Sequence, residues 1–198
     1  MTEYRLSTPV SKEDIKTLRA GDTLYLSGTM ITARDEAHHR ALEFAARGEA
    51  IPVEFRGKAV YHCGPLVRKE DGRWSVVSAG PTTSTRLELF EDRFIEEFQP
   101  RVVVGKGGMG PRTTQAMEKF GCVYGSFTGG AGALAAKSIK NVADVLWLDL
   151  GVPEALWVLD IEGFGPLSVT IDSHGRNLYL EVSEQVRRRK EAILERLS

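Results

Sequence analysis

Apolar and polar residues follow one another along the chain in short blocks that predict strands and helices in turn. Residues 23–28, TLYLSG, alternate and favour a strand. They lead through a threonine-rich loop into residues 34–48, RDEAHHRALEFAARG, where apolar positions recur along one helical side and acidic residues occupy the first turn. Gly48 is a typical helix end. We therefore predict a strand, a loop and a helix in this region.

The same order recurs around residues 102–121. Three valines predict a short buried strand that runs into GKGGMG, residues 105–110. The next stretch is typical of a helix, because Pro111 lies near its first turn and Gly121 follows its end. Elsewhere, Ser11 with Asp14 predicts a capped short helix, and RLELFEDRFIEEF, residues 86–98, predicts a helix that stops before Pro100.

Further strands are expected at 59–64 and 73–80 around a KEDG loop, and at 122–130, 143–151, 154–165 and 167–175. A small-residue helix at 131–140 lies among them, and a charged helix at 183–198 ends the chain. In that helix Glu184 lies four residues before Arg188, the favourable order for a surface ion pair. This alternation predicts an α/β fold, and 198 residues suit one domain over 1–198.

Composition excludes several classes of protein. The chain has 26 basic and 27 acidic residues, so no overall field favours nucleic acid or a membrane surface. No stretch approaches the roughly 20 apolar residues of a membrane span, and the N-terminus lacks a secretory signal, so we expect a cytoplasmic protein. Cys63 and Cys122 do not form a C-x-x-C pair, which argues against a disulfide framework or a zinc site. We expect reduced, structural thiols and no metal ligands in this chain.

Three predicted loops each carry a cation: Arg34 in GTMITARDEAHH, Arg86 in GPTTSTR and Lys106 in VVVGKGGMG. Such loops gather at one edge of the sheet in α/β proteins, where ligands commonly bind. Arginine grips a carboxylate with two parallel hydrogen bonds, and lysine adds a compact charge. Together the loops predict a site for a dicarboxylate.

Other interpretations of these stretches compete with that one. The hydroxyls at residues 82–85 are also typical of helix caps. GKGGMG has the spacing of a dinucleotide loop, but no acidic residue follows about 20 positions later. Among the histidines, His38 lies one turn from Arg34 and is the one we place at the site, whereas His62 and His174 are expected to be structural.

Five stretches in one order carry a family resemblance: SGTMITARDEAHHRALE, VYHCGP, GPTTSTR, VVVGKGGM and DLGVPEALWVLDIEGFGPLSVTIDSHGRNLY. Together they resemble the β subunit, or C-terminal domain, of the class I fumarase and L-tartrate dehydratase family, from about Gly21 to Tyr179. The resemblance implies a single swivelling β/β/α domain. It also implies a partner α subunit that ligates a [4Fe-4S] cluster through three cysteines, so that this chain alone is inactive. The resemblance further implies that the open iron of that cluster acts as a Lewis acid on the leaving hydroxyl.

The resemblance also implies roles for individual residues. Arg34 and Arg86 match arginines that hold substrate carboxylates, Lys106 matches a substrate-binding lysine, and Thr82 matches the proposed catalytic base. A threonine acts as a base only if nearby cations and a dry site stabilise its alkoxide form. Asp35 and His38 are expected behind them, as groups that orient Arg34 or relay protons.

The implied reaction is trans elimination of water from a 2-hydroxy dicarboxylate, or its reverse. We expect the β subunit of a heteromeric fumarate hydratase, which interconverts fumarate and L-malate. The alternatives are the β subunit of L-tartrate dehydratase, which no residue separates from the first, and a non-catalytic anion-binding module. The set of Arg34, Thr82, Arg86 and Lys106 argues against the last.

Overall fold

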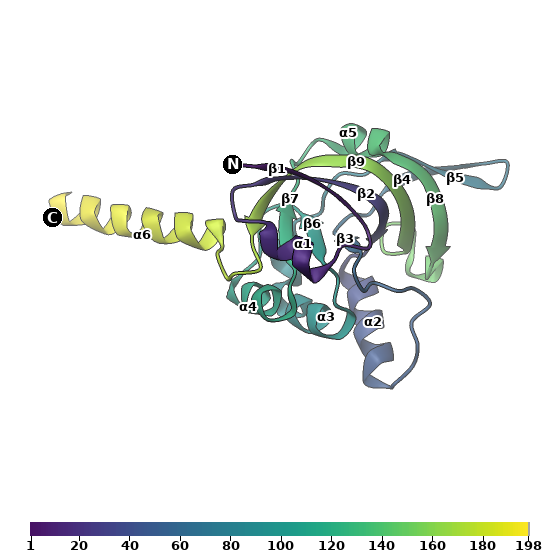
Figure 1. The fold of residues 1–198 in the computed structure, drawn as a ribbon, viewed down its shortest axis with the longest axis horizontal. Coiled ribbons are helices and arrows are strands. Elements are labelled where there is room, and N and C mark those ends of the chain that lie inside the picture. Colours follow the sequence, from purple (N-terminus) through teal and green to yellow (C-terminus); the bar gives the residue numbers. More distant parts are fainter. Residues whose placement is uncertain (198) are drawn as a thin grey trace.

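The computed structural model describes residues 1–197 and stacks two layers of strands on a layer of helices (Figure 1). The strands are β1 (Glu3–Ser7), β2 (Thr23–Thr32), β3 (Ala59–Tyr61), β4 (Leu66–Glu70), β5 (Arg73–Ser78), β6 (Val102–Gly105), β7 (Val123–Ser126), β8 (Ile139–Leu146) and β9 (Leu156–Ile171). The α-helices are α1 (Lys12–Thr17), α2 (Asp35–Ala46), α3 (Glu91–Phe98), α4 (Pro111–Phe120), α5 (Gly132–Ser138) and α6 (Leu178–Leu197). Two 3-10 helices are η1 (Ser84–Leu89) and η2 (Leu148–Leu150).

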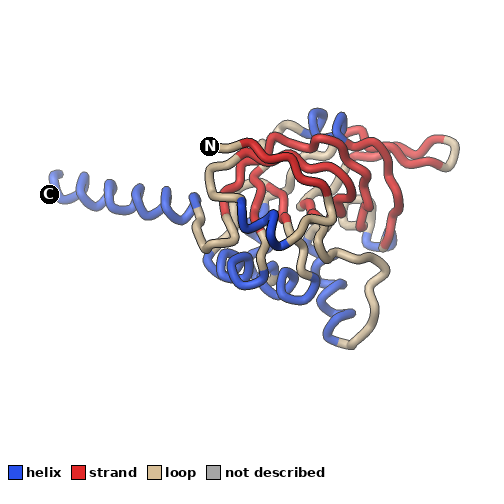
Figure 2. Tube along the Cα trace, in the orientation of Figure 1, coloured by secondary structure: helices blue, strands red, loops and turns tan. Residues whose placement is uncertain are grey.

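One seven-stranded sheet has the order β1-β2-β3-β6-β7-β9-β8, and β9 also pairs with β2. The neighbours from β1 to β7 are parallel, whereas β9 runs antiparallel to β2, β7 and β8. Pairing therefore forms a closed circuit through β2, β3, β6, β7 and β9. The helices α2, α3 and α4 gather on one side of the parallel strands (Figure 2). The predicted α/β class is confirmed.

The middle layer is buried on both faces, which explains its valine-rich strand. In β6, Val102 and Val104 belong to the core cluster between the two strand layers. Val103 points the other way, into a cluster that contains Ile95 of α3 and Met117 of α4. Because successive side chains of a strand point to opposite faces, a strand covered on both sides needs an unbroken apolar run.

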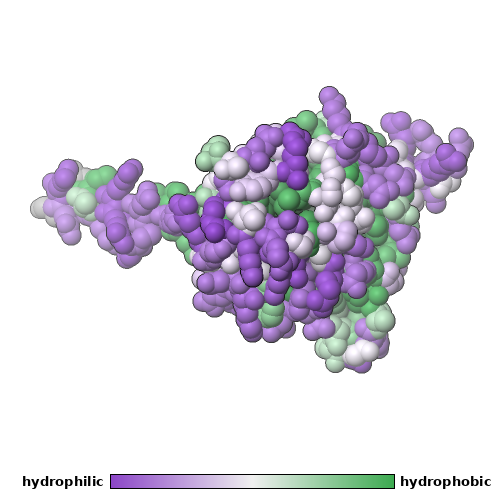
Figure 3. Space-filling view, in the orientation of Figure 1, coloured by the Kyte–Doolittle hydropathy of each residue, from purple (hydrophilic) through white to green (hydrophobic). Residues whose placement is uncertain are grey.

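Several predicted helix ends are confirmed. The Ser11 hydroxyl accepts the backbone N–H of Asp14 at 3.0 Å, and the Asp14 carboxylate accepts the N–H of Ser11 at 3.4 Å, which forms a capping box at α1. Gly121 ends α4 in the left-handed conformation. In α6, Arg188 Nε lies 2.7 Å from Glu184, as the spacing predicts. The charged helix projects from the body, and the face shown in Figure 3 is largely hydrophilic.

Three strand and helix predictions were wrong. Residues 154–165 and 167–175 were expected as two strands, but the ladder between β2 and β9 continues through Gly165 and Pro166 in one strand. The KEDG turn joins β5 to β4, not to β3, which pairs with β2 and β6. The predicted helix over 86–98 breaks at Phe90, where φ is −145°, into η1 and α3. No helix in the described part of the chain is long and apolar enough to span a membrane.

Candidate active site

The carboxyl ends of the parallel strands meet at one edge of the sheet. Thr32 of β2 is paired with Tyr61 of β3, which in turn is paired with Val104 of β6. The residues that come just after these strand ends therefore lie along the same edge. They include Arg34 and Lys106, two of the three predicted cations. This edge is the usual ligand site of α/β folds.

The GPTTSTR loop reaches this edge by lying between the ends of β3 and β6. The Thr82 N–H donates to the His62 carbonyl at 2.6 Å, and the Lys106 N–H donates to the Thr82 carbonyl at 3.2 Å. The Ser84 N–H then donates to the Lys106 carbonyl at 2.9 Å. Segment 82–84 thus acts as a short inserted strand parallel to the end of β6, with Thr83 paired with Lys106 and Thr82 joined to Lys106 through its carbonyl.

Gly105 makes room for this insertion. A Cβ at Gly105 would overlap the Ser84 hydroxyl and lie 3.0 Å from the Tyr124 hydroxyl and 3.2 Å from His62 Nδ1. The Ser84 side chain is buried there and bonded to both neighbours. The first glycine of GKGG is therefore explained by packing at the loop junction.

The predicted arginines are each paired with a carboxylate. Arg86 lies 2.7 Å from Asp35, which corrects the expectation that Asp35 orients Arg34. Arg34 instead places its Nε 3.2 Å from Glu154, a residue that the sequence did not single out. Glu154 also accepts the Glu36 N–H of α2 at 3.1 Å. These contacts tie the β2 to α2 loop to both Arg86 and the segment before β9.

Two groups at the edge are unpaired. In the part of the chain that the structure describes, neither the Thr82 hydroxyl nor the Lys106 ammonium has a hydrogen-bond or ion-pair partner, and both residues are partly exposed. A Cβ on Gly129 would lie 3.9 Å from Lys106 Nζ, which places the ammonium against the loop after β7. An unpaired ammonium on a glycine-rich loop suits an incoming anion.

The capping interpretation of the hydroxyl run was wrong for Ser84 and Thr85. Thr83 is the N-cap of η1, and it makes no side-chain capping bond. The Ser84 hydroxyl is instead buried between His62 and Tyr124, and the Thr85 hydroxyl donates to the Gly107 carbonyl at 3.2 Å. The Ser84 and Thr85 hydroxyls therefore fasten the loop to its surroundings.

The Glu88 carboxylate binds the backbone amides at the end of GKGGMG and the start of α4. Its carboxylate accepts the N–H groups of Gly110 at 2.7 Å, Arg112 at 3.0 Å and Thr113 at 3.3 Å, and the Thr113 hydroxyl at 2.7 Å. A dinucleotide phosphate would need these same amides at the start of α4. Because a carboxylate of the chain already occupies them, the structure argues against a nucleotide site.

The cysteines do not suit an iron–sulfur cluster. Cys63 and Cys122 are both buried, and they belong to different core clusters. Burial raises the pKa of Cys63 to about 12, although Arg34 opposes this, and burial also raises the pKa of Cys122. Cluster ligation requires several accessible thiolates. A [4Fe-4S] group therefore does not fit the residues of this chain.

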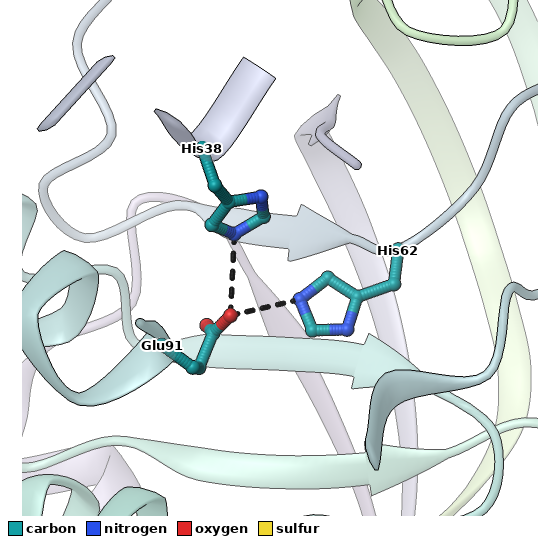
Figure 4. A group of neighbouring side chains, drawn as sticks. All are labelled: His38, His62 and Glu91. Atoms are coloured by element: carbon teal, nitrogen blue, oxygen red, sulfur yellow. Dashed lines mark ion pairs between the residues drawn. The ribbon is translucent and has the colours of Figure 1, made fainter. Parts of the chain in front are cut away.

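A buried polar cluster lies directly behind the edge, and Figure 4 shows its three side chains. Glu91 Oε2 lies 3.2 Å from His38 Nε2 and 3.3 Å from His62 Nε2, with all three side chains fully buried. Burial alone would raise the pKa of Glu91, but the two rings outweigh it and lower that pKa to about 2. Burial lowers the pKa of His62.

This cluster touches the predicted site residues through the backbone. His38 Nδ1 donates to the Arg34 carbonyl at 2.7 Å, so His38 contacts Arg34 as expected but lies inside the protein. The sequence analysis missed Glu91 because it falls within a helical stretch of ordinary charge pattern. No local signal links it to His62, which lies 29 positions earlier.

Comparison with known proteins adds an independent observation. Residues 1–182 match the family model described as Fumarase C-terminus. The chain is 44% identical over 192 residues to the L(+)-tartrate dehydratase subunit beta of Escherichia coli K12, covering 97% of this chain and 94% of that protein. It is 43% identical to a putative L(+)-tartrate dehydratase subunit beta of Methanocaldococcus jannaschii, covering 89% and 91%.

A third relative is a longer protein. The chain is 39% identical over 180 residues to a putative fumarate hydratase class I of Geobacillus stearothermophilus, which covers 90% of this chain and 34% of that protein. The chain thus matches about one third of this longer protein but nearly the whole of the separate tartrate dehydratase subunits. The same unit therefore occurs both as a separate subunit and as one part of a longer chain. The chain belongs to the class I fumarase and L-tartrate dehydratase family, in the unit described as the fumarase C-terminus.

Proposed function

We propose that this chain is the β subunit of an iron–sulfur-dependent hydro-lyase and supplies the substrate-binding edge of its active site. The observation that carries the proposal is the convergence of Arg34, Thr82, Arg86 and Lys106. Backbone hydrogen bonds join Thr82 to Lys106, and the Arg86–Asp35 ion pair joins the GPTTSTR loop to the residue next to Arg34. Three cations and one free hydroxyl at one edge suit a dicarboxylate.

Each residue of this set has a distinct task in the proposal. Arg34 and Arg86 bind the two carboxylates, and Asp35 and Glu154 hold their guanidinium groups in place. Lys106 supplies positive charge beside Thr82. Thr82 in its alkoxide form takes the proton from the carbon next to a carboxylate, and the C–O bond on the adjacent carbon breaks as the double bond forms, so that hydroxide leaves; this hydroxide and the proton on Thr82 together make up the water eliminated. His38 acts as a positioning residue through the Arg34 carbonyl.

The cluster belongs to a partner in this proposal, because the buried thiols of Cys63 and Cys122 do not fit it. We infer an α subunit that ligates the [4Fe-4S] group and covers the edge, so that the active enzyme is a hetero-oligomer. A dry interface strengthens the attraction between the cations and the charge that develops on the substrate. Two unpaired cysteines suit a reducing compartment, and we place the enzyme in the cytoplasm.

Two substrates are candidates. The first is L-malate, which is interconverted with fumarate. Its two carboxylates and one hydroxyl are the only polar groups that the predicted site residues would have to bind. L(+)-tartrate is the second, and the names of the relatives at 43–44% identity favour it. Tartrate carries one more hydroxyl, which needs a further polar partner at the edge.

The test is co-expression with the adjacent α-like subunit, followed by anaerobic assay with malate, fumarate and tartrate. We expect turnover of one of these substrates by the complex and none by the chain alone. Arg86→Ala should reduce kcat/KM at least about tenfold, whereas Arg112→Ala, which removes an exposed arginine paired with Asp92, should leave it unchanged. Equal effects of the two substitutions, or full activity of the isolated chain, would overturn the proposal.

A further inference from the structure

The buried cluster of His38, His62 and Glu91 brings together side chains from three segments. His38 comes from α2, His62 follows β3, and Glu91 begins α3. Their ligand-type atoms all lie within 4.8 Å of one another, and each side chain is fully buried. Phe90 and Phe94 pack against the His38 ring, with ring centroids 5.6 and 4.3 Å away. The cluster is therefore enclosed by protein.

The inward-facing atoms of this cluster lack hydrogen-bond partners. Within residues 1–197, His38 Nε2, His62 Nε2 and both carboxylate oxygens of Glu91 have none. The ring nitrogens lie within hydrogen-bonding distance of Glu91 Oε2, but their geometry does not satisfy a hydrogen bond. Buried polar atoms without partners are costly, and several that face one point indicate a missing ligand.

The two distances from Glu91 Oε2 to the ring nitrogens fit a small tetrahedral cation. Zinc lies about 2.0–2.1 Å from histidine nitrogen and carboxylate oxygen, so two such ligands are roughly 3.3 Å apart around a tetrahedral ion. The observed separations to Glu91 Oε2 are 3.2 Å from His38 Nε2 and 3.3 Å from His62 Nε2.

The outer nitrogens of both rings are held as they are in metal sites. His38 Nδ1 must carry a hydrogen, because it lies 2.7 Å from the Arg34 carbonyl, which can only accept. His62 Nδ1 lies 2.8 Å from the Ser84 hydroxyl, which Tyr124 also contacts at 2.8 Å. Ligating histidines usually bond through their other nitrogen in this way, which fixes the ring and directs Nε2 to the ion.

We propose that His38, His62 and Glu91 bind a structural zinc ion behind the candidate active site. The two imidazoles and one oxygen of the Glu91 carboxylate give three protein ligands, and a water molecule would complete the tetrahedron. This site departs from the expectation, drawn from cysteine content, that the chain holds no metal. It is separate from the iron–sulfur group and does not depend on the proposed substrate.

The ion has a structural consequence for the edge. The His62 carbonyl accepts the Thr82 N–H, and the His38 ring holds the Arg34 carbonyl. By joining α2, α3 and the end of β3, the ion fixes the backbone on which the substrate-binding side chains stand. Two positive charges against one carboxylate also leave a net positive charge behind a site for anions.

The experiment begins with the full chain, freed of any affinity tag, unfolded with a chelator and refolded with or without Zn²⁺. We expect about one zinc per chain after dialysis and a higher unfolding temperature for the zinc-loaded protein. Refolding with Co²⁺ should give the intense visible bands of a tetrahedral site. Glu91→Gln should lower zinc affinity at least about tenfold, since even partners of metal ligands are worth that much.

Matched controls separate this site from incidental binding. His39 is exposed on the same helix, so His39→Gln should keep the zinc content and the cobalt spectrum of the wild type. The wild-type measurements stand even if Glu91→Gln fails to fold. Refolded wild-type protein without bound zinc would overturn the proposal and favour a buried imidazolium–carboxylate pair. Zinc that is retained in a folded Glu91→Gln variant, or lost in His39→Gln, would also overturn it.

Discussion

Removal of the Glu88 side chain should destabilise the protein by loosening the start of α4. Glu88 stands in η1, yet its carboxylate accepts three backbone N–H groups and one hydroxyl from residues 110–113. Loss of a capping group costs about 0.5–2 kcal/mol. Loss of a negative charge at a helix N-terminus adds about 0.3–1 kcal/mol. We therefore expect Glu88→Ala to lower the free energy of unfolding by about 1–3 kcal/mol.

Urea unfolding followed by circular dichroism measures this change on the full chain. For a protein of this size, about 1–3 kcal/mol corresponds to a fall in Tm of roughly 2–12 °C. Glu88→Gln retains one acceptor oxygen but loses the charge, so its effect should be intermediate. Since Glu88 also fixes the loop after Lys106, the alanine variant should raise KM for the dicarboxylate in the reconstituted enzyme.

Glu96→Ala is the matched control for Glu88→Ala. Glu96 lies on α3 and forms an ion pair with Lys119, with 3.5 Å between charged atoms and both side chains exposed. Such surface pairs contribute about 0–1 kcal/mol. If Glu88→Ala is no more destabilising than Glu96→Ala, the carboxylate does not hold the helix start, and the amides of GKGGMG are open to another anion.

Three further predictions follow from the site and the core. In the reconstituted enzyme, Thr82→Ala should lower kcat by about 10² or more with little change in KM. Thr83→Ala should leave kcat and KM near their wild-type values. The reverse pattern would place the base at Thr83. Gly105→Ala should lower the free energy of unfolding by about 1–3 kcal/mol in urea titrations, because its methyl group overlaps the Ser84 hydroxyl; a neutral result would refute that crowding. Cys63 and Cys122 should react with a thiol reagent at pH 8 only after unfolding, because burial raises the pKa of both; rapid labelling of the native chain would contradict this.

The four residues at the edge are held in place in two different ways. The side chains of Thr82 and Lys106 are unpaired, but the backbone N–H and carbonyl groups of both residues are hydrogen-bonded. The backbone therefore holds both residues in place and leaves their side-chain polar groups free. Arg34 and Arg86 are each held by a carboxylate in a partly exposed ion pair, so in the proposed function a substrate carboxylate competes with Glu154 and Asp35 for them. The fixed backbone depends in turn on the buried cluster, through His62.

Local sequence was sufficient for features that depend on near neighbours. The Ser11 cap, the valine strand β6 and the glycine end of α4 follow from propensity and periodicity, and the structure contains all three. The α/β class followed from the order of such segments. The dicarboxylate site was inferred from three cations in similar loops, and the sheet brings those loops to one edge because parallel neighbours end together.

Only the tertiary structure decided which side chains meet. The Asp35–Arg86 pair joins residues 51 positions apart, and the Arg34–Glu154 pair joins residues that are farther apart still. The cluster of His38, His62 and Glu91 is closed by packing of α2 and α3 around the end of β3. Neither periodicity nor capping rules specify such contacts, since those rules describe neighbours within about four positions of one another. Long-range partners are selected by the packing of whole elements, which is why the sequence indicated the cations, Asp35 and His38, but not Glu154, Glu91 or the pairing of Asp35 with Arg86.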